Sequence, residues 1–400
     1  MKSAFVILAC GPAGFDQIAP IVWTLSEHGE EVHFLVERSL VGSDDVREEI
    51  LRSLPGVTLH PVRLPTSRLG RMNWAAFRTR RLLKRLNAGL VGVEWWDGIA
   101  DEGTSRSRAR RLATYLSAPL PLQLQFAAAK LKLPTVSFPH GHSTKTSLVP
   151  SEHIRGVVSD HGGKLPFRNR DSFSAYIFGS EYHRRVIVEN SEMSGKNTEV
   201  WGSARFSSEW IELLYSRTPQ ARIESGERRR VLMFLPKWHN SIDREGTMSL
   251  LRRLGEEGRL HVAIAGHLRA KDSALTELEI AELRSLPSLE LVGTRWSSTS
   301  LISWCEVLID VDSSIAFDAI RLGKLYVRPK YLQSDEVTTI YDQLGGAVQA
   351  RDQAHVLEIV TRETLEAAPI SDSFWPTVAG DGPESVSSRY AENLRRLLRA

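Results

Sequence analysis

The chain has 400 residues, of which 42% are hydrophobic and 25% are charged. This is the profile of a folded protein of two or three domains, and it excludes fibrous, collagen-like and disordered classes. The formal net charge of +3 is too small for a nucleic-acid-binding surface spread over the whole protein. We therefore expect no nucleic-acid partner, and any basic surface must be local.

The cysteines and the first residues bear on the compartment. Cys10 and Cys305 lie far apart in the chain, which suits a reducing compartment better than a disulfide framework. The opening apolar run passes into Gly11-Pro12-Ala13-Gly14 without a cleavage site, so we expect no signal peptide. No apolar run reaches the length of about eighteen residues that a membrane span needs. A cytoplasmic location is expected.

The first half alternates between apolar runs and helical patterns. Residues 4–10 form a predicted strand, a glycine turn follows, and residues 15–28 are apolar at helical spacing before a second strand at 31–36. Strand, helix and strand in this order predict a parallel sheet. Further predicted strands cover 57–62, 88–93, 135–138, 175–180 and 198–202.

The second half repeats this alternation after a polar stretch. Its predicted strands are 230–236, 260–266, 289–292, 307–311 and 324–329, and its predicted helices are 248–257, 274–283, 298–304 and 314–322. The fold class is therefore α/β, with two Rossmann-like parallel-sheet domains that face a cleft. We expect domains at 1–205 and 230–370, a linker at 206–229, and a tail at 371–400 whose helix folds back on the first domain.

The first candidate site follows the strand at 135–138. It contains His140, Gly141, His142, Ser143 and Lys145, and ligands of open α/β sheets bind beyond such strand ends. A histidine there can act as general base toward a hydroxyl, because its ordinary pKa is near neutral. The alternative is a polar surface loop.

The second candidate site follows the strand at 307–311. Asp312-Ser313-Ser314 looks like the cap of a helix that begins near Ser314. The free amides of such a terminus, together with the serine hydroxyls, can bind phosphate. The alternative is a cap without a ligand. Asp310-Val311-Asp312 also matches a short metal-binding pattern, but Asp310 falls within the predicted strand, so we expect no metal.

Two other strand ends carry cations. Lys237 and His239 follow the strand at 230–236, and His267 and Arg269 follow the strand at 260–266. Each pair can contact an anion. The alternative is a solvated turn for the first pair and a structural histidine for the second.

A basic segment lies in the first domain. Residues 51–93 contain nine arginines and lysines and no acidic residue. Aromatic and leucine residues accompany the cations between 63 and 85, so this segment can contact an anionic membrane surface or an anionic acceptor. The alternative is a solvated helix face. A peripheral position at the inner face of the membrane is compatible with it.

A run of motifs between about 135 and 335 resembles a known family. The motifs are His140-Gly141, Phe178-Gly179-Ser180-Glu181-Tyr182, Val200 to Arg205, Leu232 to Trp238, His267, Asp312 to Asp318 and Arg328-Pro329. Their order resembles GT-B-fold transferases of surface polymers, especially the CDP-glycerol glycerophosphotransferase (teichoic-acid polymerase) type and related capsule enzymes. The resemblance implies that His140 is the acceptor base, that His267 helps to hold the donor phosphates, and that Ser313 and Ser314 bind donor phosphate.

These observations together predict a metal-independent transferase. It would move a glycosyl or polyol-phosphate group from a nucleotide-activated donor of the CDP, UDP or CMP type to a hydroxyl of a cell-surface, capsular or lipid-linked polysaccharide, with no cofactor. The first domain would bind the acceptor and the second the donor, with Arg328 among the donor contacts. One alternative is an enzyme similar to UDP-sugar 2-epimerases, although the strand ends offer histidines and serines more than carboxylates. The other is a non-catalytic glycan-binding or assembly protein.

Overall fold

The computed structural model describes residues 3–38, 45–63, 76–95, 118–139, 141, 144, 146, 152–238, 240–266, 275–293, 295–311, 313–333 and 338–399. Contacts within the chain divide it into two compact units. Unit 1 comprises Met1–His142, Val158–Trp210 and Trp375–Ala400, and unit 2 comprises Ser143–Val157 and Ile211–Phe374. The C-terminal segment thus belongs to the same unit as the N-terminus, and a short stretch near residue 150 belongs to the second unit.

Unit 1 is built on a seven-stranded parallel sheet of order β3-β2-β1-β4-β5-β6-β7. The strands are β1 (Ala4–Ala9), β2 (Val32–Glu37), β3 (Val57–Val62), β4 (Ala88–Glu94), β5 (Thr135–Phe138), β6 (Ala175–Phe178) and β7 (Thr198–Val200). The helical elements are α1 (Pro12–Glu27), α2 (Val46–Ser53), α4 (Ala76–Arg85), α6 (Leu120–Leu131), η3 (Arg168–Ser172), α8 (Glu181–Glu189), η4 (Ala204–Phe206) and α17 (Val386–Arg399). Every residue of β1 is buried, as expected for a central strand covered on both faces.

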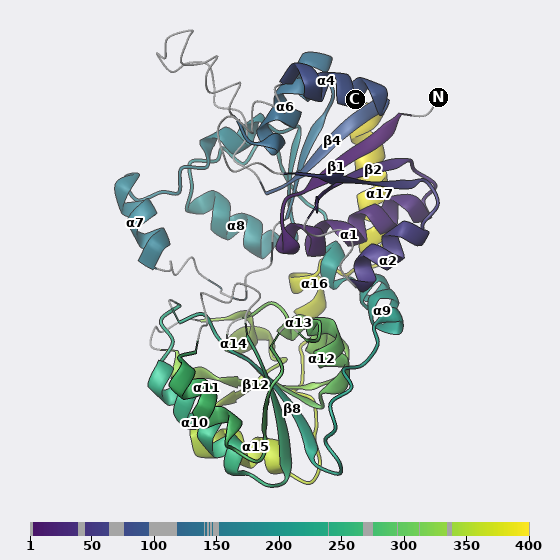
Figure 1. Ribbon diagram of the computed structural model, residues 1–400. Helices are drawn as coiled ribbons and strands as arrows, with labels where there is room; N and C mark the ends of the chain where they lie inside the picture. Colours follow the sequence, from purple (N-terminus) through teal and green to yellow (C-terminus); the bar gives the residue numbers. More distant parts are fainter. Residues whose placement is uncertain are drawn as a thin grey trace. The chain divides into compact units, whose positions relative to one another are not determined.

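The last helix closes unit 1. Helix α17 packs along α1 (Figure 1), and its Tyr390 hydroxyl donates to the Gly202 carbonyl at 3.0 Å. Arg395 pairs with the buried Glu30 carboxylate at 2.7 Å. Burial of one face of α17, from Val386 to Leu394, together with these polar contacts anchors the last helix to unit 1.

Unit 2 contains a six-stranded parallel sheet of order β10-β9-β8-β11-β12-β13. The strands are β8 (Arg229–Phe234), β9 (Leu260–Ala265), β10 (Leu289–Leu291), β11 (Val307–Ile309), β12 (Leu325–Pro329) and β13 (Val348–Ala350). The helical elements are α10 (Arg244–Glu256), α11 (Glu277–Arg284), α12 (Ser298–Trp304), α13 (Ala316–Arg321), η6 (Lys330–Leu332), α14 (Ile340–Leu344) and α15 (Gln353–Thr361). Helices α7 (Glu152–Asp160), α9 (Ser208–Arg217) and α16 (Phe374–Val378) contain the points where the chain divides.

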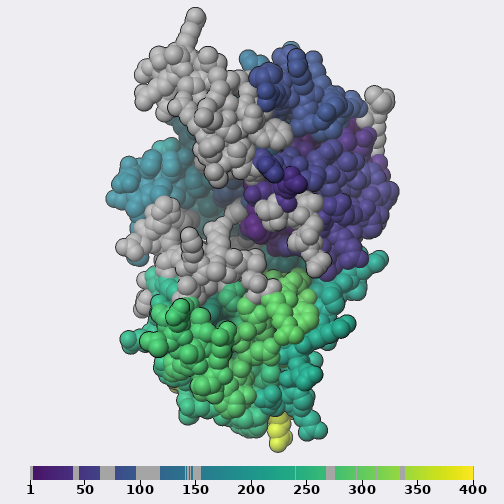
Figure 2. All heavy atoms as spheres, in the orientation of Figure 1, coloured from purple at the N-terminus to yellow at the C-terminus, as the bar shows by residue number. Residues whose placement is uncertain are grey.

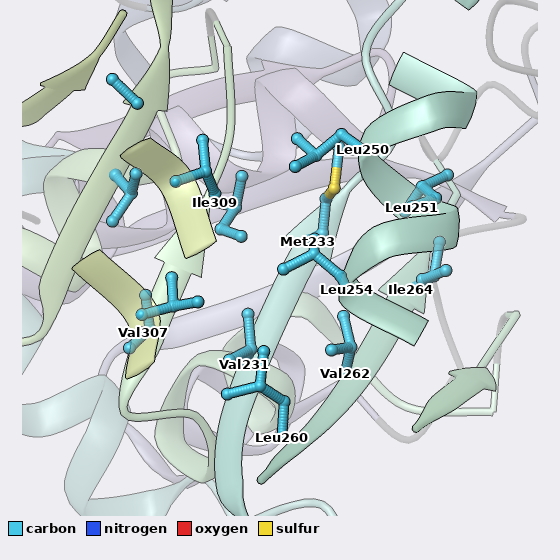
Figure 3. Close-up of a cluster of buried hydrophobic side chains, with 14 of the residues drawn as sticks. Val231, Met233, Leu250, Leu251, Leu254, Leu260, Val262, Ile264, Val307 and Ile309 are labelled. Carbon is cyan, nitrogen blue, oxygen red and sulfur yellow. The ribbon is translucent and has the colours of Figure 1, made fainter. Parts of the chain in front are cut away.

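The core of unit 2 lies between its sheet and the helices on one face. Alternate residues of β8, β9 and β11 meet the apolar side of α10, as Figure 3 shows for Met233, Ile264 and Leu254. All three are at least 98% buried. This packing fixes β8 beside β11, whose carboxyl ends carry the candidate residues described below.

The structure confirms most of the predicted strands and corrects several boundaries. The strand predicted at 307–311 ends at Ile309, so Asp310 follows the strand. The helix predicted at 314–322 begins at Ala316. Strand β13 was not predicted, because its three residues are too few to show an alternating pattern. Among the described residues, no helix is both long and apolar enough to cross a bilayer.

Candidate functional site

The sheet of unit 2 reverses its strand order between β8 and β11. Ligands of open parallel sheets bind beyond the carboxyl ends of the strands at such a point. Met233 of β8 pairs with Ile309 of β11. Lys237 and Ser313 each follow their paired residue by four positions, so the topology brings these two predicted residues to the same edge of the sheet.

The turn after β11 differs from the predicted helix cap. The Ser313 amide donates to the Asp310 carboxylate at 2.7 Å, and the Ser313 hydroxyl accepts from the Ile315 amide at 3.3 Å. The Ala316 and Phe317 amides then donate to the Ser313 and Ser314 carbonyls. Ser313 is therefore committed to the turn, and six-residue α13 starts two residues later than predicted. Within the described part of the chain, the half-buried Ser314 has no partner for its amide or hydroxyl.

The Asp310 carboxylate is a structural group in this turn. Asp310 is 3% exposed and its carbonyl accepts from the Tyr326 hydroxyl at 3.2 Å. Across the described ranges, no group of three or more histidine, cysteine and acidic side chains is arranged to hold a metal ion.

Arg328 lies inside the protein. Its side chain is fully buried, and Nε donates to the Val311 carbonyl at 3.0 Å. The other guanidinium nitrogens donate to Gln333 at 2.6 Å and Gln349 at 3.3 Å. The predicted direct contact with a donor does not fit this burial, because the guanidinium faces acceptors of the protein. Arg328 instead holds the segment after β11 in place.

Lys237 and Arg244 follow β8 in the chain. Lys237 is half-buried and its carbonyl accepts from the Asn240 amide at 3.0 Å. Nearby, Arg244 lies over the Trp238 ring and pairs with Glu279 at 2.7 Å. The pKa of Glu279 is lowered to about 2, mainly by its hydrogen bonds with Arg244. Arg244 is therefore neutralised within unit 2.

Several predicted residues lie outside the described part of the chain. They are His140, His142, Ser143, Lys145, His239, His267, Arg269 and Asp312. Gly141 is described and half-buried, and a Cβ atom there would meet no atom within 4 Å. The predicted catalytic and acceptor roles of these residues stay predictions.

The strand order of the unit 1 sheet reverses between β1 and β4. The carboxylate of Glu94 occupies the turn that follows β1 at this reversal. Glu94 ends β4 and is 8% exposed, and it accepts a hydrogen bond from the Cys10 amide at 3.1 Å. Its Oε2 lies so close to α1 that a Cβ atom at Gly14 would be 1.5 Å away. The negative charge at the start of this sixteen-residue helix is favourable.

Glu94 was missed in the sequence, although a signal exists. It is the first acidic residue after a long basic stretch and directly follows an apolar strand. Burial raises the pKa of the Cys10 thiol, and the charges of Glu94 and Glu37 raise it further. These surroundings disfavour the thiolate, which is the nucleophilic form of cysteine.

An aromatic cluster follows β4 and β6 in unit 1. The Trp95 ring stacks on His183 at 5.6 Å, and the Arg170 guanidinium lies 4.7 Å from the Trp95 centroid. Burial lowers the pKa of His183 to about 4. Because its imidazole is neutral at physiological pH, one ring nitrogen can accept a hydrogen bond and the other can donate one. This histidine adds a described polar group to the carboxyl edge of the sheet.

The two switch points therefore offer different chemistry. Unit 2 presents a lysine and a serine after adjacent strands, and among the described residues the amide and hydroxyl of this serine have no partner, which suits an anionic ligand. In unit 1 the first strand-to-helix turn already holds a carboxylate, which would repel phosphate.

The chain was compared with known proteins. No family model and no curated sequence matches it. Among solved structures it is similar to UDP-GlcNAc 2-epimerase from Methanocaldococcus jannaschii, with a TM-score of 0.58, 12% identity and 100% of both chains covered. UDP-GlcNAc 2-epimerase from Neisseria meningitidis bound to UDP-GlcNAc matches with a TM-score of 0.55 and 12% identity, again over 100% of both chains. Alr3699/HepE from Anabaena in complex with UDP and glucose matches with a TM-score of 0.51 and 12% identity, over 99% of this chain and 95% of that chain.

These similarities concern the fold, because the identities are low. Two Rossmann-like parallel sheets of seven and six strands match this group of structures. The predicted fold class of two Rossmann-like parallel-sheet domains is confirmed, and it is that of GT-B structures.

Proposed function

We propose that the protein is an enzyme acting on a nucleotide-activated sugar or polyol, and that unit 2 binds the diphosphate of this donor. The observation that carries the proposal is the contrast between the switch points. Glu94 occupies the first turn of unit 1, whereas Ser314 and Lys237 follow adjacent strands of unit 2. The similar structure from Neisseria meningitidis is bound to UDP-GlcNAc, and the one from Anabaena is in complex with UDP and glucose. Both support a nucleotide ligand for this protein.

The reaction we propose is transfer to a hydroxyl group. His140 would take the proton from an acceptor hydroxyl of a cell-surface or capsular polysaccharide, and the oxygen would attack the activated carbon or phosphorus of the donor. The bond to the nucleotide phosphate would break, so that the nucleotide leaves with the bonding electron pair. Lys237, His267 and the amide and hydroxyl of Ser314 would offset the charge that develops on this phosphate, without a metal ion.

The remaining predicted residues would complete the two substrate sites. His239 and Arg269 would add cationic contacts to the donor, and Gly141, His142, Ser143 and Lys145 would contact the acceptor. Ser313 would act by shaping the turn, since its own amide and hydroxyl are already used.

The test is turnover of UDP-, CDP- and GDP-activated donors, with and without polysaccharide acceptors. His140→Ala and Ser314→Ala should each lower turnover by about 10-fold or more, as expected for loss of a base or of a phosphate contact. Ser216→Ala is the matched control, because Ser216 is exposed and its hydroxyl donates only to the Leu213 carbonyl of its own helix among the described contacts. Unchanged turnover in both test variants would overturn the transfer reaction.

A second candidate reaction is epimerisation of a nucleotide sugar. It is favoured by Glu94, a carboxylate at the end of a central strand, because moving a proton on and off carbon needs such a base. Two of the similar structures are also UDP-GlcNAc 2-epimerases. An epimerised product formed without any acceptor, and lost in Glu94→Gln, would favour this reaction. Glycan binding without affinity for any nucleotide would instead favour the non-catalytic alternative.

A further inference from the structure

Helix α4 of unit 1 presents an unusual cationic surface. Its ten residues, AFRTRRLLKR, include five cations and no acid. The side chains that it exposes are Phe77, Arg78, Arg80, Arg81, Lys84 and Arg85. We call these six residues the α4 face. In Figure 2 the blue spheres of this part of the chain lie at the surface.

The α4 face has an aromatic ring at its centre. At about 100° per residue, Arg81 and Lys84 lie within about 40° of Phe77, and the other three cations lie within about 100°. Thr79, Leu83 and Leu86 point the opposite way and are buried. Phe77 is 56% exposed, and the Arg78 guanidinium lies 5.6 Å from its ring centroid.

The charge of the α4 face is not explained by helix stability. Lys84 and Arg85 suit the C-terminal end of a helix, but Arg78, Arg80 and Arg81 lie in its first half, where the dipole disfavours cations. Within the described ranges, Arg80, Arg81 and Lys84 have no carboxylate partner. Their mutual repulsion is unfavourable until an anionic partner arrives.

We propose that the α4 face docks unit 1 on an anionic lipid bilayer. A flat negative surface can meet all five cations of a convex helix face at once, and each contributes favourably near such a surface. The exposed ring at the centre can enter the boundary between headgroups and acyl chains. An anionic polymer would also attract the cations, but it would gain less from the apolar ring. This proposal goes beyond the proposed reaction and does not depend on it.

The test is sedimentation of the full chain with phosphatidylcholine vesicles, with and without phosphatidylglycerol. The protein should bind only the vesicles that contain phosphatidylglycerol, and binding should weaken as salt rises. Arg81→Gln/Lys84→Gln should weaken binding by about 30-fold, which corresponds to about 1 kcal/mol for each cation. Phe77→Ser should weaken it by about fivefold and leave its salt dependence unchanged.

The matched control is Lys164→Gln/Lys196→Gln, which removes the same charge from exposed positions elsewhere in unit 1. It should bind as the wild type does, and thermal melting should show that all variants are folded. Equal weakening by the control would overturn the proposal, since the effect would then be one of net charge. Binding to heparin or single-stranded DNA without binding to any vesicle would also overturn it and would identify an anionic polymer as the partner.

Discussion

The Glu94 carboxylate accepts a hydrogen bond from the Cys10 amide at 3.1 Å, and so fills the turn between β1 and α1. In many Rossmann-like domains this turn holds a phosphate on the first helix. Here the protein supplies its own anion, from the end of the neighbouring strand. This relationship underlies our proposal that the donor diphosphate binds in unit 2, and it leads to the predictions that follow.

Gly14→Ala should destabilise unit 1 by about 2–4 kcal/mol, because the new methyl group displaces a carboxylate that is hydrogen-bonded and nearly buried. Urea denaturation measures the loss. Gly11→Ala is the control: its Cβ atom would meet nothing within 4 Å, so the change should be about 1 kcal/mol or less. Combining Gly14→Ala with Glu94→Ala should restore part of the stability. If the changes in the free energy of unfolding caused by the two substitutions are simply additive, Glu94 does not fill the space beside Gly14.

Asp16→Asn should destabilise the protein by about 3 kcal/mol, because it leaves the guanidinium groups of Arg205 and Arg47 without this carboxylate. Asp16 lies 2.8 Å from Arg205 and 2.6 Å from Arg47. Burial alone would raise the pKa of Asp16, but the two positive charges outweigh it and the pKa is lowered.

A carboxyl group with a lowered folded-state pKa stabilises the protein above its unfolded value of about 3.9. That stability is lost as the pH falls through the folded-state pKa. In urea titrations below about pH 4, Asp16→Asn should therefore lose part of the wild-type pH dependence. An identical slope in both proteins would contradict the ion-pair assignment.

The His183 imidazole should stay neutral down to about pH 4, the value to which burial lowers its pKa. In the unfolded chain its pKa is about 6.5. Between these values the unfolded state binds the extra proton, so stability should fall as the pH drops from about 6.5 to 4. His183→Phe keeps an aromatic ring on Trp95 and should remove this contribution. An NMR titration of His183 with a midpoint near 6.5 would be inconsistent with this burial.

The sequence was most informative where structure depends on local pattern. Apolar runs such as 4–9 and 260–265 are buried on both faces of a sheet, so their composition alone predicts strands. The βαβ order then predicts a parallel sheet. In a parallel sheet the carboxyl ends of all strands lie at one edge. Lys237 after β8 and Ser313 after β11 could therefore be placed at that edge.

Contacts between distant residues could not be predicted in this way. Glu94 meets Cys10 across 84 residues, and nothing in the local sequence of either residue indicates the pairing. Arg328 was predicted to contact the donor because Arg328-Pro329 belongs to the run of motifs that resembles the transferase family. Its burial depends on Gln333 and Gln349 from neighbouring segments, which a strand pattern does not show.

Arg328→Met should destabilise unit 2 by about 2–4 kcal/mol, because it leaves the Val311 carbonyl and the Gln333 side chain without their buried donor. Arg328→Lys should restore little of this, since one ammonium group cannot span acceptors that a guanidinium reaches together. Urea denaturation gives both values. If Arg328→Met has wild-type stability but binds the nucleotide more weakly, Arg328 contacts the donor as the sequence predicted.

The most direct test of the account is where the nucleotide binds. Calorimetry should use whichever of UDP, CDP, GDP and CMP raises the Tm most, since a ligand of the folded state does so. Ser314→Glu should weaken that binding by at least about 10-fold through charge repulsion and a lost phosphate contact. Ser216→Glu and Glu94→Gln should leave it unchanged. Affinity that survives in Ser314→Glu and changes markedly in Glu94→Gln would place the phosphate in unit 1 and contradict the account.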